Sequence, residues 1–276
     1  MSAPHVAFVD STLAGLLAFE TAKKMGCRVT FIEPLDSSFL SISTSDASRI
    51  DPHLKKVDEH IKLPTLGDGA LTRTIRHLCE ANPVSAIMTT SEAAIIPVAQ
   101  TAQETGLLTP GRLALEQAVL KDRCRQALAR AGLRSPRFQV LTEEELIAGA
   151  ARWIKAPLVV KPTRGFGKQF SAVCKAETDL DAFVASLLDA RRSTDPMINL
   201  IVNNQYILEE YVVGSLHSTE VVVAKGEVQV FATTTRYRSQ HNELLETAYS
   251  MPAGLEKSKQ AAMEDYARDV FKAVGI

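Results

Sequence analysis

The sequence predicts an α/β fold for residues 1–111 and an α+β fold for the rest of the chain. In the first part, short apolar runs alternate with helix-like stretches, which is the pattern of a parallel sheet. In the second part the order of strands and helices is mixed, and residues 224–227 have the composition of a hairpin turn. The chain has 276 residues, of which 46% are hydrophobic, so it can bury more than one core.

The first part opens as a βαβ unit. The run HVAFVD is short and apolar and ends at Asp10, and the helix-like stretch after it ends at Gly26, which suits a helix C-cap. The next run, CRVTFIEP, is rich in β-forming residues. Gly106, Pro110 and Gly111 then interrupt the pattern and mark a domain boundary. The elements expected before that boundary are a strand at 5–10, a helix at 13–25, a strand at 27–34, a helix at 71–80, a strand at 85–91 and a helix at 92–104.

Beyond the boundary a long helical pattern comes first, and Gly132 closes it. The elements expected from there on are a helix at 113–131, a strand at 137–142, a helix at 143–153, strands at 157–162 and 171–176, a helix at 180–190, and strands at 199–213 and 219–235. Residues 191–204 are the least regular segment. The sequence shows no internal repeat or low-complexity tract.

The charge balance excludes several functional classes. The chain has 31 Lys and Arg against 32 Asp and Glu, so no net field draws it to nucleic acid or to an anionic membrane. The amino terminus has no basic region before its apolar run, and no apolar run is long enough to span a membrane. The four cysteines are widely separated and show no CxxC spacing, which indicates reduced packing residues in a cytoplasmic protein.

Two enzyme classes are disfavoured by the motifs. The stretch DSTLAG after the first strand lacks the GxGxxG geometry of a dinucleotide-dependent oxidoreductase. The serines and the six histidines lie in no nucleophile-elbow or metal-binding pattern. Neither serine-hydrolase nor zinc chemistry is therefore expected.

The run VVKPTRGFGK combines a strand-end lysine with a two-glycine turn. Glycines let backbone N–H groups approach phosphate oxygens, and Lys161 and Lys168 supply positive charge, so this run can form a phosphate site. It is not a P-loop, because GxxxxGK[ST] is absent. The alternative is an exposed hairpin turn in which Arg164 and Lys168 are only solvated.

The run YILEEYVVG is a second candidate for ligand binding. Its apolar strand ends in Glu209 and Glu210, and the backbone that follows can hydrogen-bond the edge of a purine while apolar flanks cover the ring. The alternative is a strand end with two solvated glutamates.

The order and spacing of these runs resemble the ATP-grasp superfamily. Lys121, then Lys161 before the glycine turn, then the run around Glu209, and then Glu220 in a strand follow one another as in that superfamily. The stretch LKDRCRQALARAGLRSP is similar to the helix that leads into its catalytic domain. The stretch MTTSEAAIIPVAQTAQETGLLTPG is similar to the junction before that helix in the subgroup of L-amino-acid ligases and related carboxylate–amine ligases.

The resemblance implies roles for individual residues. The two lysines would contact the phosphates or the adenine of ATP, the glycines would form a lid over the phosphates, and the run after Glu209 would hold adenine. Glu220 would lie near the ribose or the substrate. The implied ATP-binding residues are Lys121, Lys161, Gly165, Gly167, Lys168, Glu209, Glu210, Tyr211, Val212 and Glu220, and the implied substrate-side residues are Glu246 and Arg236.

The resemblance also implies a domain organisation. Residues 1–111 would be a Rossmann-like pre-ATP-grasp domain, 112–205 the leading helix and lid subdomain, and 206–276 the beginning of the C-terminal ATP-grasp subdomain. Members of the superfamily carry a Glu and a Glu-x-Asn-x-Arg motif further on, which bind Mg²⁺. This chain ends before either, so we expect an incomplete ATP-grasp domain with no metal ligands of its own, inactive by itself.

The implied function is ATP-dependent ligation of a carboxylate to an amine through an acyl phosphate. ATP and Mg²⁺ would be the cofactors, the substrates would be small molecules such as amino acids, and a homodimer is compatible with the resemblance. Phe166 in the loop differs from the small residues of many relatives, and Ala248 and Tyr249 stand where the superfamily has Gly-His in VExGHxxP. The alternative function is a non-catalytic nucleotide-binding or interaction module with the same fold.

Overall fold

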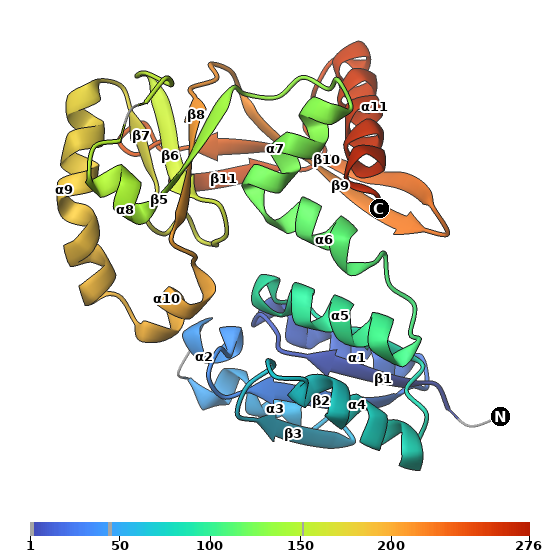
Figure 1. Cartoon of the computed structure of the whole chain (residues 1–276). Helices are drawn as coiled ribbons and strands as arrows, with labels where there is room; N and C mark the ends of the chain where they lie inside the picture. The colour runs from blue at the N-terminus through green and yellow to red at the C-terminus, as the bar shows by residue number, and fades with distance from the viewer. Residues whose placement is uncertain (1–2, 44–45, 151) are drawn as a thin grey trace. The chain divides into compact units, whose positions relative to one another are not determined.

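The computed structural model describes residues 3–43, 46–150 and 152–276, and the chain forms two compact units (Figure 1). The first unit consists of Met1–Glu116 together with Asp195–Ile201. The second consists of Gln117–Thr194 and Val202–Ile276. Each unit contains its own β-sheet structure.

The first unit is built on a four-stranded parallel sheet with the strand order β3-β2-β1-β4. The predicted βαβ opening and the parallel sheet are confirmed. The sequence analysis missed β3, because three of its five residues are charged or polar and the strand is only partly buried at the edge of the sheet. The strands are β1 (His5–Val9), β2 (Arg28–Pro34), β3 (Glu59–Leu63) and β4 (Ala86–Met88).

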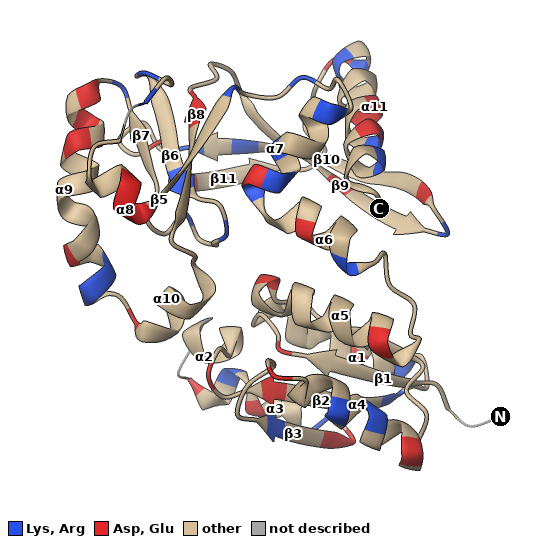
Figure 2. Cartoon of the chain, in the orientation of Figure 1, with Lys and Arg blue, Asp and Glu red and all other residues tan. Residues whose placement is uncertain are grey.

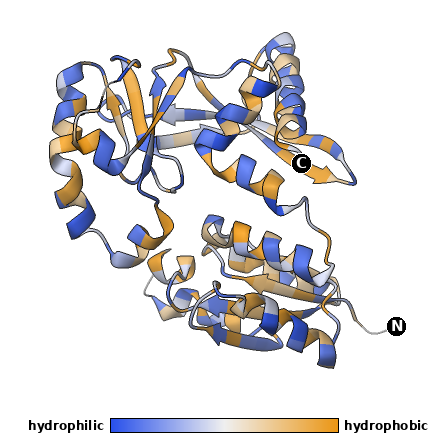
Figure 3. Cartoon of the chain, in the orientation of Figure 1, coloured by the Kyte–Doolittle hydropathy of each residue, from blue (hydrophilic) through white to orange (hydrophobic). Residues whose placement is uncertain are grey.

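Two separate hydrophobic clusters lie on the two faces of this sheet, whose strand β1 is mainly hydrophobic (Figure 3). On one face the ring of Phe19 packs between Phe8 and Phe31, with centroids 5.0 Å away in both directions. The other face packs against Ile75 and Val98. Burial of each such side chain contributes about 1.5–3 kcal/mol. The helices of this unit are α1 (Leu17–Lys24), α2 (Phe39–Ser43), α3 (Asp51–Leu54), α4 (Ala70–Ala81), α5 (Ile95–Thr105) and α10 (Pro196–Ile201).

The second unit contains two antiparallel sheets, which confirms the predicted α+β character. Their strand orders are β5-β8-β6-β7 and β11-β10-β9. The predicted hairpin turn joins β9 to β10, with Lys225 and Gly226 both in left-handed backbone conformations. The strands are β5 (Phe138–Thr142), β6 (Leu158–Pro162), β7 (Ala172–Cys174), β8 (Gln205–Glu210), β9 (Leu216–Ala224), β10 (Glu227–Arg238) and β11 (Glu246–Ser250).

The pairing of β6 with β8 determines which side chains share a face of the first sheet. Val159 lies directly opposite Glu209 in this antiparallel pair. Lys161 is two residues beyond Val159, so it lies on the same face as Glu209. The residues of the opposite face, such as Val160 and Leu208, are fully buried. The apolar alternation of both strands therefore fixes a lysine and a glutamate on one face.

The helix predicted over 113–131 is wrong in one respect, because it is two helices. They are α6 (Arg112–Val119) and α7 (Lys121–Arg130). The break lies at Leu120, whose backbone is extended with φ −84° and ψ 114°. Directly after it, the N–H of Lys121 donates to the carbonyl of Thr163 at 2.9 Å. The apolar periodicity continues across the break, so a tertiary hydrogen bond rather than the helical pattern marks where the second helix begins.

The helix predicted over 143–153 ends too late. Helix α8 (Glu143–Ile147) begins with a capping box between Thr142 and Glu145, and its first turn is acidic (Figure 2). It ends because Gly149 adopts φ +71°, and the N–H groups of residues 149 and 150 donate to carbonyls of the last turn. This is a Schellman end, for which the glycine was the sequence signal.

The strand predicted over 199–213 begins too early. Asp195 accepts a hydrogen bond from the N–H of Met197 at 2.8 Å, and Pro196 occupies the first helical position. This Asp-Pro start produces α10, and β8 begins only at Gln205. The remaining α-helices of the described residues are α9 (Glu177–Ser193) and α11 (Lys257–Val274).

Candidate functional site

The loop between β6 and β7 lies against the start of α7. The Nζ of Lys121 donates to the carbonyl of Gly165 at 3.2 Å, next to the backbone contact with Thr163. Gly167 and Lys168 follow with φ of +58° and +59°, a backbone conformation that lysine rarely adopts. The loop is a hairpin connection, because β6 and β7 pair antiparallel, and a lysine from a helix distant in sequence holds its backbone.

A buried carboxylate on β8, opposite Val159 of β6, lies between two cations. Glu209 has a side chain only 5% exposed; its Oε2 is 2.6 Å from Nζ of Lys161 and its Oε1 is 2.7 Å from Nε of Arg125. Burial alone would raise the pKa of Glu209, but the charges and hydrogen bonds of Lys161 and Arg125 together lower it below its ordinary value. Glu209 is therefore ionised and doubly paired.

Arg125 was missed by the sequence analysis. It lies on α7 four residues after Lys121, so the two side chains share one face of the helix. The four-residue spacing from Lys121 was the only sign of Arg125 in the sequence. It indicates a role for Arg125 only when β8 is known to lie against this helix. Arg125 therefore joins α7 to the end of β8.

The residues after Glu209 point in different directions. The side chain of Glu210 pairs with Arg137, with 2.7 Å between Oε2 and Nε, and hydrogen bonds from Arg137 lower the pKa of Glu210. The hydroxyl of Tyr211 donates to Glu243 at 2.5 Å. Val212 is 61% exposed. The side chains of this run thus hold the strand end in place, and its apolar flank is open to solvent.

The carboxylate of Glu243, in the loop before β11, contacts three side chains, those of Tyr211, Lys175 and Arg238. The Nζ of Lys175 lies 2.5 Å from Glu243 and 3.9 Å from the centre of the Tyr211 ring. Arg238 approaches the same carboxylate at 3.5 Å. Hydrogen bonds from Lys175 and Tyr211 lower the pKa of Glu243. This cluster connects the end of β7 to the loop before β11.

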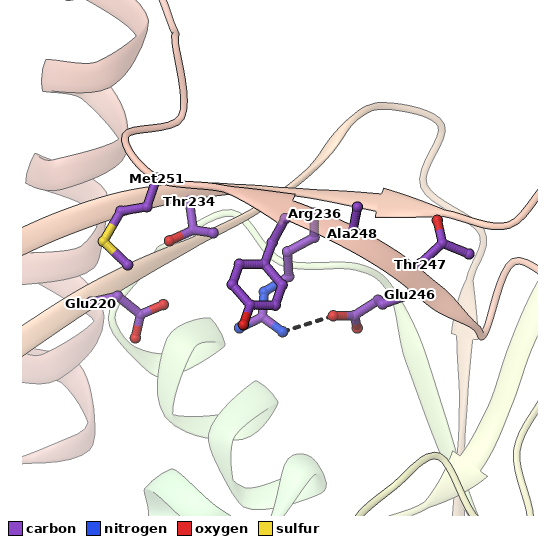
Figure 4. Close-up of a pocket in the computed structure, with 8 residues that line it drawn as sticks. Glu220, Thr234, Arg236, Glu246, Thr247, Ala248 and Met251 are labelled. Carbon is purple, nitrogen blue, oxygen red and sulfur yellow. Dashed lines mark hydrogen bonds and ion pairs between the residues drawn. The ribbon is translucent and has the colours of Figure 1, made fainter. Parts of the chain in front are cut away.

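A pocket of about 270 Å³ opens on the sheet β11-β10-β9 (Figure 4). Arg236 crosses it and pairs with Glu246, with 2.8 Å between Nη1 and Oε2. The Nε of Arg236 also donates to Ser218, whose hydroxyl donates to Glu220 at 2.9 Å. Thr234 is 4% exposed, and its hydroxyl has no hydrogen-bond partner within the described part of the chain. The pocket lining consists of Glu220, Thr234, Arg236, Glu246, Thr247, Ala248, Tyr249 and Met251.

Glu246 links this pocket to the glycine loop. Its Oε1 is 2.6 Å from Nζ of Lys168, while its Oε2 binds Arg236. The hydrogen bonds of these two cations lower the pKa of Glu246. The second unit thus brings Lys161 and Glu209 into one group and Lys168, Glu220, Arg236 and Glu246 into another. Glu210, Tyr211 and Val212 belong to neither group.

No group of three or more His, Cys, Asp or Glu side chains that could hold a metal ion occurs among residues 3–43, 46–150 and 152–276. The four cysteines are free thiols. Within the same residues, no helix combines the length and the apolar composition needed to cross a membrane.

Two family models match the chain. Residues 154–276 match the ATP-grasp domain, and residues 19–109 match the ATP-grasp N-terminal domain. The two matches together cover more than half of the 276 residues. They fall on both compact units.

Curated proteins and a solved structure resemble the chain as well. It is 28% identical over 171 residues to a D-alanine–D-alanine ligase of Ectopseudomonas mendocina, covering 60% of this chain and 50% of the ligase. It is 24% identical over 205 residues to an alanine–anticapsin ligase of Bacillus amyloliquefaciens, covering 70% of this chain and 43% of that protein. The crystal structure of an L-amino acid ligase from Bacillus licheniformis superposes with a TM-score of 0.77 at 21% identity, over 100% of this chain and 61% of that one. The chain spans about half the length of the curated relatives it matches.

Proposed function

We propose that this chain, which belongs to the ATP-grasp superfamily, carries the nucleotide-binding site of an ATP-dependent carboxylate–amine ligase. Such an enzyme forms an amide or peptide bond through an acyl phosphate. The carboxylate would be an amino acid or another small acid, and the second substrate an amine. The similarity to two ligases that act on alanine supports this assignment.

The observation that carries the proposal is the contact of Lys121 with a two-glycine loop that follows Lys161 in the chain. Lys121 donates to the carbonyl of Gly165, and Lys161 lies at the end of the strand that enters the loop. Ammonium groups and glycine backbone N–H groups are the donors that bind phosphate oxygens. We assign this loop, with Gly167 and Lys168, to the phosphates of ATP.

Adenine is assigned to the end of β8. The backbone of residues 210–212 would hydrogen-bond the edge of the purine, and the exposed Val212 would cover part of the ring. Glu209, whose two carboxylate oxygens are paired with Lys161 and Arg125, would keep this strand end in place. Glu220, on the neighbouring sheet, is assigned to the ribose or the substrate. These assignments use the spacing of the superfamily together with the positions of the side chains.

The pocket around Arg236 and Glu246 is assigned to the substrates. A carboxylate oxygen would attack the γ-phosphorus, the bond from that phosphorus to the bridging oxygen would break, and ADP would leave. The amine would then attack the acyl carbon, lose a proton, and release phosphate. Lys168 and Arg236 would offset the negative charge on the transferred phosphoryl group.

Mg²⁺ belongs to the proposal only as the ion that accompanies the phosphates of ATP. Mg²⁺ is commonly held by one or two carboxylates together with phosphate oxygens. The described residues offer no cluster of three ligating side chains and so do not by themselves fit a resident metal site. No step is therefore assigned to a metal.

Nucleotide binding and turnover test the proposal separately. We expect calorimetry of the 276-residue chain to detect ATP binding. Turnover is measured as ADP release with a panel of amino acids, on this chain and on the product of the full reading frame that contains it. Failure of both proteins to bind ATP would refute the proposal. ATP binding without ADP release from either protein would support a non-catalytic nucleotide-binding module instead.

A further inference from the structure

Glu209 is shared between two cations whose side chains are about equally exposed, 25% for Lys161 and 24% for Arg125, but which differ in chemistry and attachment. Lys161 reaches Oε2 with a flexible four-carbon side chain. Arg125 reaches Oε1 from α7, whose first residue is hydrogen-bonded to the start of the glycine loop. The carboxylate itself is 5% exposed, so solvent compensates little of its charge.

This sharing bears on the phosphate role proposed for Lys161. To bind a phosphate oxygen with its full charge, Lys161 must loosen its contact with Glu209. A buried carboxylate without a partner is strongly unfavourable, so a lone Lys161–Glu209 pair would resist this exchange. Arg125 changes the balance, because it keeps one oxygen of Glu209 paired throughout.

We propose that Arg125 is a positioning residue that holds Glu209 in place and thereby frees Lys161 for the nucleotide phosphates. The inference rests on the proposed function, since it presumes that ATP binds beside Lys161. Arg125 acts through Glu209 and is not assigned a contact with the nucleotide. Its guanidinium suits this role because it stays charged at all working pH values and binds through a fixed planar group.

The test is the affinity of the 276-residue chain for ATP and for adenosine, measured by calorimetry. Arg125→Gln is expected to weaken ATP binding by about tenfold or more, because Lys161 stays on Glu209, and to change adenosine binding by less than about threefold. In the Glu209→Gln background the same substitution is expected to change ATP binding by less than about threefold, since no buried charge remains to hold Lys161.

Arg112→Gln is the matched control. Arg112 contacts Glu116 through the same atom at the same 2.7 Å, but its side chain is 49% exposed and neither residue is assigned to the nucleotide. We expect it to leave ATP affinity unchanged. Arg125→Lys, which keeps a cation near Glu209, is expected to recover part of the loss and covers the case in which Arg125→Gln fails to fold, as judged by thermal unfolding.

The outcomes separate this inference from the proposed function. If the unmodified chain binds neither ATP nor adenosine, the proposed function fails. If it binds ATP and Arg125→Gln binds ATP equally well, only the role of Arg125 is overturned. Equal weakening of ATP and adenosine, or an undiminished effect in the Glu209→Gln background, would also overturn that role, because Arg125 would then act on the fold or on the base.

Discussion

Lys168 in the loop between β6 and β7 is paired with Glu246 on β11, with 2.6 Å between Nζ and Oε1. The same carboxylate holds Arg236, which crosses the pocket on the second sheet. A loop assigned to phosphates and a pocket assigned to substrates thus share one acidic side chain. If Glu246 loses one of these two partners, both the loop and the pocket are therefore affected.

We predict that Lys168→Ala loosens the loop without much effect on global stability. The Lys168 side chain is 39% exposed, so its ion pair contributes no more than about 1 kcal/mol. Hydrogen exchange of residues 163–171 should become faster. Lys225→Ala is the control, since Lys225 also has a positive φ, 54° against 59°, and the alanine meets the same backbone strain. Equal exchange of the 163–171 loop in both variants would show that the pair does not hold it.

The sequence predicted the elements whose pattern is local. The parallel sheet of the first unit, the strands β5 and β6 and the hairpin at Lys225 follow from apolar alternation and turn composition. Gly149 is a C-cap glycine and therefore also indicated the end of α8, but the apolar residues beyond it were interpreted as a continuation of the helix.

Other features depend on contacts between distant segments. The break at Leu120 follows from the hydrogen bond of Lys121 to Thr163. The apolar periodicity of the sequence continues across Leu120 and gives no sign of this break. Arg125 acquires a role only because β8 brings Glu209 to α7. The sequence could name Lys161 and Glu209 as separate candidates, and the register of β6 with β8 makes them a pair.

Lys161→Ala is expected to weaken ATP binding by about tenfold or more, the scale of a lost charge-assisted hydrogen bond. Glu209 keeps Arg125 as its partner in this variant, so the chain should still fold. Adenosine affinity should change much less than ATP affinity, because the ammonium is assigned to phosphate. Calorimetry with both ligands checks this, with Lys225→Ala as the control. An unchanged ATP affinity would remove Lys161 from the site.

Glu209 should make the stability of the second unit depend on pH in the acid range. Its pKa is lower in the folded chain than its ordinary value of 4.5, so its ionised form contributes stability above about pH 4.5. That contribution is lost as the pH falls through the folded pKa. We expect Glu209→Gln to be less stable than the unmodified chain by about 1–3 kcal/mol at pH 7.

The measurement is urea unfolding of the unmodified chain and of Glu209→Gln between pH 7 and pH 3. The difference between their free energies of unfolding should shrink as the pH drops below about 4.5. Other carboxylates titrate in the same range, and taking the difference cancels their effect. A difference that stays constant over this range would mean that the pairs with Lys161 and Arg125 do not stabilise the ionised form.

Thr234 and Thr233 offer a comparison between a pocket residue and a purely buried one. Both are nearly inaccessible, at 4% and 2% exposure, and neither hydroxyl finds a hydrogen-bond partner in the described residues. Replacing either with valine removes a buried unsatisfied hydroxyl at nearly constant shape, so each variant should be as stable as the unmodified chain or up to about 1 kcal/mol more stable.

Of these two threonines, only Thr234 lines the pocket with Arg236. Its hydroxyl is therefore available to a bound substrate, and Thr234→Val should lose most of the rise in melting temperature caused by the best amino acid of the panel, whereas Thr233→Val should keep it. Loss of that rise in both variants, or in neither, would show that the Thr234 hydroxyl does not take part in substrate binding.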